Sequence, residues 1–186
     1  MRLAAEVDAL AAELEASRAR IAELEARVDI DSLTDVLNRR GFERELTRSL
    51  AYVKRYGTCA ALIFVDLDGF KPVNDRHGHA AGDAMLKAIA AALMANVRAS
   101  DVVARIGGDE FAVLLWNVDA AAAAAKAAVL EAAVYSTQVH LGASTVVVGA
   151  SAGVAPLGAL DSPGEVLARA DAAMYARKAR RKHATQ

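Results

Sequence analysis

The stretch Arg105–Phe111, which reads R-I-G-G-D-E-F, constrains the fold of this chain more than any other part of the sequence. Apolar segments lie on both sides of it: Val102–Ile106 before the glycines and Phe111–Trp116 after them. Both segments are short and rich in β-branched or aromatic residues, which predicts two strands joined by a hairpin turn at residues 107–110.

The turn itself combines two glycines with two carboxylates. Gly107 and Gly108 have no Cβ, so they tolerate positive φ angles and let a phosphate or sugar lie against the main chain. Asp109 and Glu110 add negative charge beside that position, and carboxylates next to a phosphate indicate a divalent metal ion. An ordinary acidic hairpin turn is the alternative for Gly-Gly-Asp taken alone.

A second acidic strand end lies in Ala61–Asp83, where a continuous apolar run stops at Asp66 and Asp68. A buried carboxylate without a partner is costly, so an aspartate at the end of an apolar strand caps a helix, faces solvent or binds a cation. Mg²⁺ prefers one or two carboxylates together with phosphate oxygens, which Asp66 and Asp109 from neighbouring strand ends would complement.

Several motifs, in order, resemble one family. The segment D-S-L-T-D-V-L-N-R-R-G-F is similar to the pattern D-x-L-T-G-L-x-N-R-R-x-F of the GGDEF diguanylate cyclases, with Asp35 in place of the usual glycine. The resemblance continues through D-L-D-G-F-K-P-V-N-D, H-G-H-A-A-G-D, R-I-G-G-D-E-F, A-S-A-G-V-A and R-A-D-A-A-M-Y-A-R-K. Members of this family condense two GTP molecules into cyclic di-GMP and release pyrophosphate.

The resemblance implies roles for the acidic residues and one lysine. Asp66, the backbone carbonyl of Leu67 and Asp109 would hold Mg²⁺, with Mn²⁺ as the alternative ion. Asp109 and Glu110 would be catalytic, Asp109 assisting removal of the attacking proton. Lys71 would stabilise phosphate charge, although a lysine at such a position taken alone reads as a surface residue.

The same comparison implies a substrate pocket. A carboxylate such as Asp83 can accept the N–H donors of guanine, so Asn74 together with Asp83 favours guanine over adenine. The alternatives without a ligand are a turn at Asn74, a loop position for His79 and an N-cap role for Asp83. The full set of substrate-binding candidates is Asn74, His79, Asp83, Phe70, Gly107, Gly108, Lys178 and Lys182.

The last two candidates lie in a stretch that departs from the family pattern A-K-x-x-G-R-N, because this chain reads R-K-A-R-R-K-H from Arg177 to His183. Lys178 keeps the place of the family's lysine. Lys182 falls where the family has an arginine, so a phosphate contact there would lack the bidentate geometry of a guanidinium. A solvated basic helix end, suited to the C-terminal dipole, is the alternative.

The tetrapeptide R-A-S-D, Arg98 to Asp101, matches the family's R-x-x-D inhibitory site. The resemblance implies that Arg98 binds phosphate or guanine of the product and Asp101 accepts guanine donors. A chance match at a surface helix end is the alternative. The helix that often adds an arginine is here an alanine-rich segment with only Lys126, so we expect weaker product affinity.

The first 30 residues show a heptad pattern, with apolar residues at alternating spacings of four and three. The seam predicts a parallel two-stranded coil, weakened at Ser17, and Glu13 and Arg20 would face Arg18 and Glu25 of a second copy. An amphipathic helix packed on its own domain is the alternative. We therefore expect a coiled-coil helix over residues 1–30 and a catalytic domain over residues 31–186. The seam residues are Leu3, Val7, Leu10, Leu14, Ile21, Leu24 and Val28.

Composition agrees with an intracellular enzyme domain. The chain has 186 residues, of which 55% are hydrophobic, and its net charge of −1 argues against a protein that coats nucleic acid or a membrane surface. The single cysteine, Cys59, cannot form an internal disulfide and is expected to pack in the core of a cytoplasmic protein. No signal peptide or 18-residue apolar span is visible, although the chain could be a fragment of a longer protein.

The remaining patterns predict an α+β fold with a mixed central sheet flanked by helices. A first strand is expected within Tyr52–Asp66, helices over Ala80–Val97 and Ala120–Ala133, and a strand over Thr145–Ala155. Ser162 to Glu165 read as a capping box that opens the last helix. The resemblance narrows this fold to the nucleotidyl-cyclase palm, in which strand ends present the metal site.

We therefore expect a diguanylate cyclase that acts as a homodimer on GTP and is inhibited by cyclic di-GMP. Three alternatives remain at this stage. A catalytically silent domain could bind GTP or cyclic di-GMP as a receptor, a purely structural module could serve dimerisation, and a related cyclase could make another cyclic dinucleotide.

Overall fold

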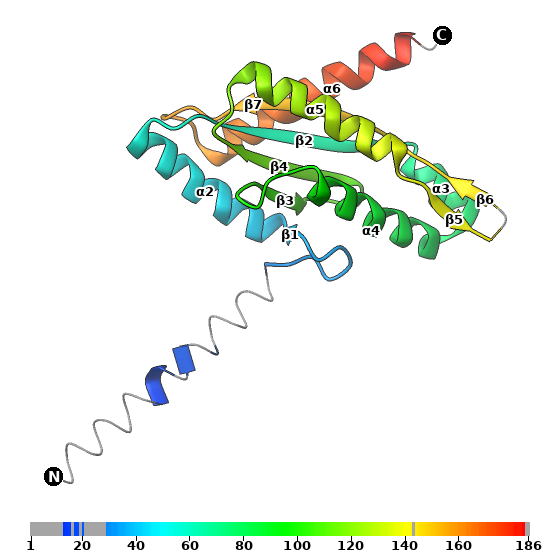
Figure 1. The fold of residues 1–186 in the computed structure, drawn as a ribbon, viewed down its shortest axis with the longest axis horizontal. Helices are drawn as coiled ribbons and strands as arrows, with labels where there is room; N and C mark the ends of the chain where they lie inside the picture. The colour runs from blue at the N-terminus through cyan, green and yellow to red at the C-terminus, as the bar shows by residue number, and fades with distance from the viewer. Residues whose placement is uncertain (1–12, 16, 19, 21–28, 143, 185–186) are drawn as a thin grey trace.

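The computed structural model describes residues 13–15, 17, 18, 20, 29–142 and 144–184 (Figure 1). Its helices are α2 (Arg39–Tyr56), α3 (Phe70–His77), α4 (His79–Ala95), α5 (Ala120–Ser136) and α6 (Pro163–Ala184). Its strands are β1 (Leu37–Asn38), β2 (Ala60–Asp68), β3 (Val102–Arg105), β4 (Glu110–Trp116), β5 (Val139–Leu141), β6 (Ser144–Val146) and β7 (Gly149–Pro156).

The central sheet has five strands in the order β1-β3-β4-β2-β7. The β1–β3 pair is parallel, whereas β3–β4, β4–β2 and β2–β7 are antiparallel, so the sheet is mixed as expected. The β3–β4 hairpin encloses residues 106–109, and it confirms the turn predicted from the two apolar segments. A separate two-stranded sheet pairs β5 with β6.

Helices cover both faces of this sheet (Figure 1). Strand side chains alternate between the faces: Ile63 and Val65 of β2 pack with buried residues of α3, α4 and α5. Leu62 and Phe64 of the same strand pack on the opposite face with buried residues of α2 and α6. The fold is therefore a three-layer α+β sandwich.

Helix α2 accounts for the largest difference from the sequence-based expectation. It is N-capped by Asn38, whose Oδ1 accepts from the Gly41 N–H at 3.0 Å, and it ends at Gly57 with φ of 66°. A glycine in the left-handed conformation typically ends a helix. Tyr52 therefore lies in the last turns of α2. The strand expected within Tyr52–Asp66 is β2, which begins only at Ala60 and runs to Asp68.

Two expectations were wrong. The single strand predicted over Thr145–Ala155 is divided between β6 and β7, and Val147 is 46% exposed between them. Cys59 precedes β2 and is exposed, so it does not pack in the core.

The two C-terminal helices begin as the sequence predicts. In α6, Ser162 N–H and Oγ both donate to Glu165 Oε2 at 2.8 Å, which confirms the capping box. The alanine run forms α5, which buries Leu130 and Val134, whereas Val129 is 47% exposed. Predicted helix Ala80–Val97 corresponds to α4 within two residues at either end.

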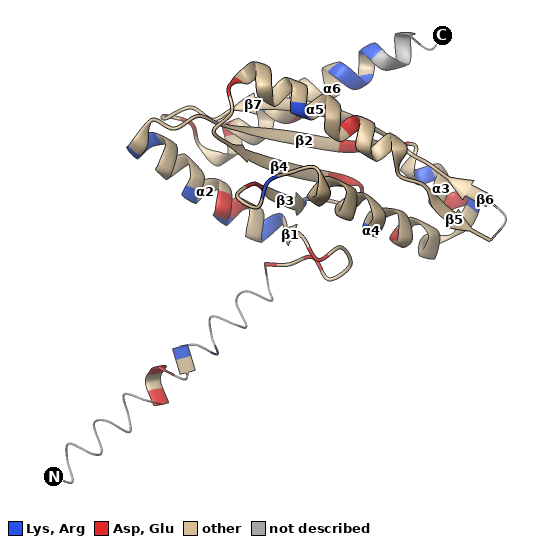
Figure 2. Cartoon of the chain, viewed as in Figure 1, with Lys and Arg blue, Asp and Glu red and all other residues tan. Residues whose placement is uncertain are grey.

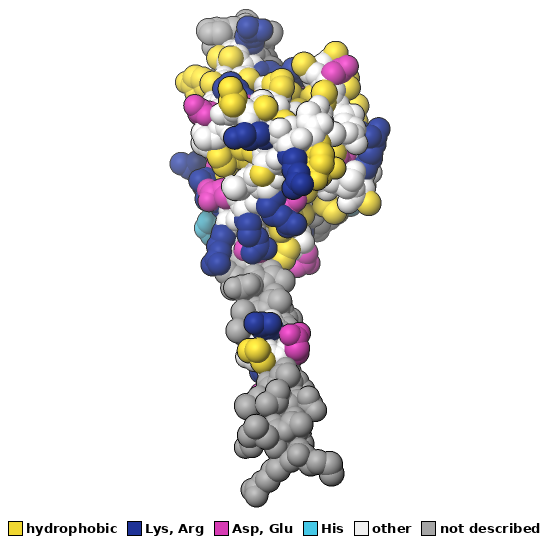
Figure 3. Space-filling view, turned by 90° about the vertical axis from the view of Figure 1, so that its left-hand side faces the viewer, with side chains coloured by type: hydrophobic (Ala, Val, Ile, Leu, Met, Phe, Trp, Pro, Cys, Tyr) yellow, Lys and Arg dark blue, Asp and Glu magenta, His cyan; other side chains and the backbone are white. Residues whose placement is uncertain are grey.

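Most of the heptad lies outside the described residues. Residues 13–15, 17, 18 and 20 are helical, and Leu14, one of the seam positions, is 52% exposed. None of the helices in the described part of the chain is long and apolar enough to span a membrane. The face of the molecule at the left of Figure 1 carries many Lys and Arg side chains (Figure 3).

Gly153 in β7 lies directly against the backbone of α6. A Cβ built at Gly153 would lie 2.1 Å from the carbonyl oxygen of Ala170 and 2.1 Å from the backbone nitrogen of Met174. Both contacts are backbone atoms, which no rotamer change can move. The A-S-A-G-V-A motif is therefore a packing site that brings α6 onto the sheet.

We expect Gly153→Ala to lower the unfolding free energy by about 3 kcal/mol, because α6 must shift away from β7 to admit one methyl group. Gly164→Ala is the matched control, since a Cβ at Gly164 meets nothing within 4 Å and an alanine inside a helix gains up to about 1 kcal/mol. Urea unfolding of both variants measures the difference. Equal stability of Gly153→Ala and the wild type would contradict this packing argument.

Candidate functional site

The acidic residues of the two central strands meet at one end of the sheet. Asp66 in β2 pairs in register with Glu110 in β4, so the two side chains project from the same face of the sheet, the face covered by α2 and α6. Beside them the Leu67 N–H donates to the Asp109 carbonyl at 3.1 Å. The structure thus brings together Asp66, Leu67, Asp109 and Glu110, as the sequence predicts.

The carboxylates affect one another. Burial raises the pKa of Glu110 above its usual value, and the negative charges of Asp66 and Asp109 raise it further, while Arg39 opposes the shift. Both burial and nearby negative charge disfavour the ionised form of a carboxyl group. Glu110 is therefore suited either to accept a proton or to share a cation.

Lys178 of α6 contacts the two acids at the end of β2, Asp66 and Asp68. Its Nζ forms a short ion pair with Asp66 Oδ1 and lies 3.5 Å from Asp68 Oδ1. Burial alone would lower the pKa of Lys178, but the contacts with Asp66 and Asp68 outweigh it and raise the pKa. Figure 2 shows further Lys and Arg positions along the last turns of α6.

The donor set fits a divalent metal ion completed by a bound nucleotide. Among the described residues, no three His, Cys, Asp or Glu side chains are grouped closely enough to hold a metal by themselves. Mg²⁺ needs only one or two carboxylates when phosphate oxygens supply the remaining ligands. The mutual repulsion at Asp66, Asp109 and Glu110, and the ammonium already drawn to Asp66, agree with a cation site.

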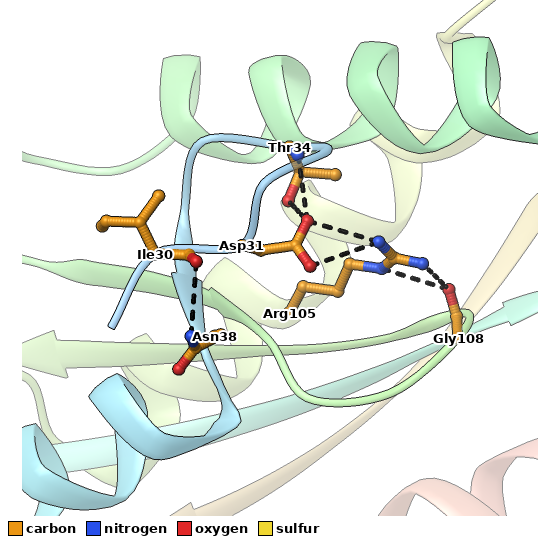
Figure 4. A network of polar contacts seen from close by, with 6 residues as sticks. All are labelled: Ile30, Asp31, Thr34, Asn38, Arg105 and Gly108. Carbon is orange, nitrogen blue, oxygen red and sulfur yellow. Dashed lines mark hydrogen bonds and ion pairs between the residues drawn. The ribbon is translucent and has the colours of Figure 1, made fainter. Parts of the chain in front are cut away.

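Two arginines hold the hairpin turn by its backbone. Arg105 donates from Nε and Nη2 to the Gly108 carbonyl at 3.2 and 2.9 Å, and its Nη1 contacts both oxygens of Asp31 (Figure 4). Arg39, the first residue of α2, donates from Nε to the Ile106 carbonyl at 3.1 Å. Sequence reasoning missed both contacts, although each arginine belongs to a motif that it singled out.

Gly107 and Gly108 serve the turn differently from the expectation. The described glycines with positive φ are Gly57, Gly69, Gly78 and Gly142, so neither hairpin glycine uses that region. A Cβ at Gly107 would lie 2.4 Å from Glu110 Oε2, whereas a Cβ at Gly108 would meet nothing within 4 Å. Gly107 therefore leaves room for the Glu110 carboxylate, and Gly108 leaves an open surface above the turn.

The expected nucleotide pocket is divided between α3 and α4. Asn74 lies on α3, and His79 and Asp83 are exposed residues four positions apart on one face of α4. A Cβ at Gly82 would fall 1.9 Å from Asn74 Oδ1, so this glycine lets the Asn74 amide rest against α4 beside Asp83.

The turn, loop and N-cap positions considered for these residues are not observed. Asn74 is helical, His79 opens α4, and the N-cap of α4 is Gly78 rather than Asp83.

The other expected substrate contacts differ in exposure. Lys71 is exposed in the first turn of α3. Phe70 is only 8% exposed and packs in the core, so its side chain supports α3 from below instead of facing a ligand. Lys182 lies in α6, but its side chain is outside the described part of the structure.

Arg98 and Asp101 form a tight turn between α4 and β3, beyond the helix end at Ala95. Asp101 accepts from the Arg98 N–H at 2.9 Å and from the Trp116 N–H at 3.1 Å, so its carboxylate shapes the turn. Among the described residues, the Arg98 guanidinium makes no hydrogen bond or ion pair, and the side chain is exposed. Lys126 instead donates to the Asn96 carbonyl at 3.0 Å and caps α4.

Comparison with known proteins places these features in one family. The family model described as "Diguanylate cyclase, GGDEF domain" matches residues 28–184. Diguanylate cyclase TpbB of Pseudomonas aeruginosa is 41% identical over 184 residues, which is 95% of this chain and 42% of that protein. The probable diguanylate cyclase DgcE of Escherichia coli is 39% identical over 169 residues, 87% of this chain and 15% of that protein.

Solved structures agree with the sequence relatives. The coiled coil and GGDEF domain of DgcB from Caulobacter crescentus, in complex with c-di-GMP, superposes with a TM-score of 0.81 at 29% identity and covers 96% of this chain and 95% of that one. The GGDEF domain of TpbB superposes with a TM-score of 0.75 at 41% identity and covers 81% and 89%. The chain spans less than half of the curated relatives named above.

The Asp31–Arg105 contact makes a prediction about acid stability. Burial would raise the pKa of Asp31, but hydrogen bonds from Thr34 and the charge of Arg105 lower it on balance. Since the folded pKa lies below the unfolded value of about 3.9, the contact stabilises fully above that pH and is lost as the pH falls through the folded pKa. We expect Asp31→Asn to cost about 2 kcal/mol at neutral pH and to flatten the loss of stability at acid pH.

Chemical unfolding between about pH 3 and 7 measures both effects. Asp75→Asn, at an exposed position on α3, is the matched control. An Asp31→Asn protein with the wild-type acid slope would show that this carboxylate does not carry the linkage.

Proposed function

The chain belongs to the GGDEF family of diguanylate cyclases, and on that premise we propose that it condenses two GTP molecules into cyclic di-GMP with release of pyrophosphate. The observation that carries the proposal is the register that sets Asp66 opposite Glu110 beside Asp109, with Lys178 drawn to the same acids. Because GTP is a cytoplasmic metabolite, this activity would take place in the cytoplasm.

The acidic end of the sheet would act on the α-phosphate. Asp66, Asp109 and the Leu67 carbonyl would hold Mg²⁺, or Mn²⁺ in its place, which when bound offsets phosphate charge and orients the triphosphate. Asp109 would assist removal of the proton of the 3′ hydroxyl, and the adjacent Glu110, whose pKa is raised mainly by burial, is suited to accept it. The 3′ oxygen would then bond to the α-phosphorus as the bond to pyrophosphate breaks.

Basic and polar residues would hold the nucleotide in place. Lys71 and Lys178 would bind phosphate oxygens, and Lys182 would extend that contact along α6. Asn74 and Asp83 would recognise the guanine edge, with His79 beside them on α4. Gly108 would let the nucleotide lie against the hairpin, since nothing within 4 Å occupies the space above its Cα.

Each domain would bring one GTP, so two domains must face each other. A parallel coiled coil over residues 1–30, joined to a catalytic domain over residues 31–186, would raise the effective concentration of the second domain and set its orientation. Support comes from the exposed Leu14 and from the DgcB structure, which contains a coiled coil with its GGDEF domain and covers 96% of this chain.

We expect Asp66→Asn and Asp109→Asn each to reduce cyclic di-GMP formation by at least about 100-fold, because each removes one charge from the cation site. Chromatography of the purified chain incubated with GTP and Mg²⁺ measures the product. Thermal melts should stay near the wild type, since Lys178 keeps Asp68 as a partner when Asp66 is neutral.

Asp75→Asn is the control here as well. Near-normal product from either site variant would contradict the assignment of the acids, and an inactive wild-type chain would contradict the proposed reaction.

Product inhibition belongs to the same proposal. The Arg98–Asp101 turn leads directly into β3 and the catalytic hairpin, so cyclic di-GMP bound there would be linked by chain to the site. The exposed Arg98 guanidinium is available for phosphate or guanine, and the Asp101 oxygens retain lone pairs beyond those used by two backbone donors. Structures of DgcB with c-di-GMP bound support a product site in the family.

We expect Arg98→Ala to keep the wild-type initial rate while its progress curves stay linear as product accumulates. Titration calorimetry should show affinity for cyclic di-GMP falling by roughly 10- to 100-fold, because a hydrogen bond from a charged group contributes about 1.5 to 3 kcal/mol. Lys87→Ala, on the exposed surface of α4, is the control. Equal cyclic di-GMP affinity of Arg98→Ala and the wild type would exclude this turn as the inhibitory site.

A further inference from the structure

Glu131 is a buried acid that no part of the proposed mechanism uses. It lies on α5, is 7% exposed, and contacts two other elements. Its Oε1 accepts from the backbone N–H of Ala152 in β7 at 2.9 Å. Its Oε2 accepts from Nη2 of Arg177 in α6 at 2.5 Å.

The first contact closes an open edge of the sheet. β7 is the last strand in the order β1-β3-β4-β2-β7, and it pairs with β2 on one side. Buried backbone donors at such an edge need an acceptor. The Glu131 carboxylate supplies one for Ala152, and Arg177 then reaches from α6 on the other face of the sheet to the same carboxylate.

Neighbouring residues carry a parallel set of contacts toward the catalytic acids. Ser151, next to Ala152, donates from Oγ to Asp68 Oδ2 at 2.7 Å. Lys178, next to Arg177, pairs with Asp66 and Asp68. Ala152 and Arg177 therefore contact Glu131 of α5. Their chain neighbours Ser151 and Lys178 contact the two acids of β2.

The ion pairs at Arg177 and Lys178 matter because the buried, apolar part of α6 ends before these two residues. Met174 is 5% exposed and is the last buried residue of the helix up to residue 180. Figure 1 shows the end of α6 extending beyond the sheet. The direction in which Lys178 points is therefore set by ion pairs at residues 177 and 178, and Arg177 stands where the family pattern has alanine.

We infer that Glu131 is a positioning residue of the nucleotide site: through Arg177 it fixes the turn of α6 from which Lys178 reaches Asp66 and Asp68. The inference rests on the proposed function in one respect, that Lys178 contacts phosphates of GTP. Such a contact acts on substrate and transition state alike, so loosening it raises KM and leaves kcat unchanged.

The test uses Arg177→Gln, at a side chain that is 46% exposed, and Glu131→Gln, which keeps an acceptor for the Ala152 N–H. We expect either substitution to raise KM for GTP roughly tenfold, with kcat near the wild-type value. Asp161→Asn is the matched control, because it removes another ion pair of α6, Asp161 with Arg169 at 2.6 Å, far from Lys178 in the helix. This control should lower the melting temperature without changing KM.

A double-mutant cycle with Lys178→Met separates positioning from general stability. If Glu131 acts through Lys178, adding Arg177→Gln to Lys178→Met raises KM no further, whereas independent effects would multiply. An unchanged KM in both single variants, or full multiplication in the double variant, would overturn the inference.

Binding of inorganic pyrophosphate, measured by calorimetry, gives a readout that needs no turnover. Its affinity should fall in Arg177→Gln and Glu131→Gln and stay constant in Asp161→Asn. A wild-type chain that makes no cyclic di-GMP but shows this pattern would refute the proposed reaction and keep the positioning role. Equal pyrophosphate affinity in all four proteins would refute the positioning role.

Discussion

The antiparallel register of β2 and β4 is the constraint on which the rest of the site depends. It places Asp66 and Glu110 opposite each other on one face, with Asp68 and Asp109 nearby, and sheet pairing prevents them from moving apart. Lys178 bears one positive charge against these four carboxylates. Burial raises the pKa of Glu110, and the charges of Asp66 and Asp109 raise it further against the opposing charge of Arg39. On the proposed function, a divalent cation with its triphosphate would complement these grouped carboxylates.

The hairpin that carries two of these acids is held through main-chain carbonyls. Arg39 binds the carbonyl of Ile106 and Arg105 binds that of Gly108, so the acidic side chains remain available while the backbone is fixed. Arg105 also binds Asp31, in the segment that joins the N-terminal residues to the domain (Figure 4). A displacement of that segment would therefore be transmitted to the β3–β4 turn through the Arg105 guanidinium, which contacts both Asp31 and Gly108.

The same junction is fixed to α2 by a second acid. Asp29 is 2% exposed, its carbonyl accepts from the Asn38 N–H at 2.8 Å, and its carboxylate pairs with Arg44 and, more distantly, Arg40. Gly41 makes this possible, because a Cβ there would lie 2.4 Å from the Asp29 carbonyl oxygen. Asp29 and Asp31 thus join the junction to α2 and to the hairpin respectively.

Sequence patterns predicted the elements that local chemistry determines. The capping box at Ser162, the β3–β4 hairpin and the acidic end of β2 each depend on residues adjacent in the chain. The sequence located β2 only within Tyr52–Asp66, because Tyr52 and Val53 suit a strand as well as a helix, and in the structure the left-handed Gly57 ends the helix before the strand begins. Contacts such as Arg39 with Ile106 join residues 67 positions apart, and no local pattern specifies them.

Lys178 shows how the charge balance of the apo site and nucleotide binding are coupled. Its ion pairs raise its pKa, so it stays charged, and they hold it over the acids before any ligand arrives. On the proposed function, a cation that binds Asp66 would compete with this ammonium for the same oxygen, and phosphate oxygens that accompany the cation would offer the ammonium a new anionic partner. Exchange of partners would therefore keep Lys178 paired with an anion at each stage, which a neutral residue at position 178 could not do. The acidic end of the sheet and the basic turn of α6 are consequently one site, although 112 positions separate Asp66 from Lys178 in the chain.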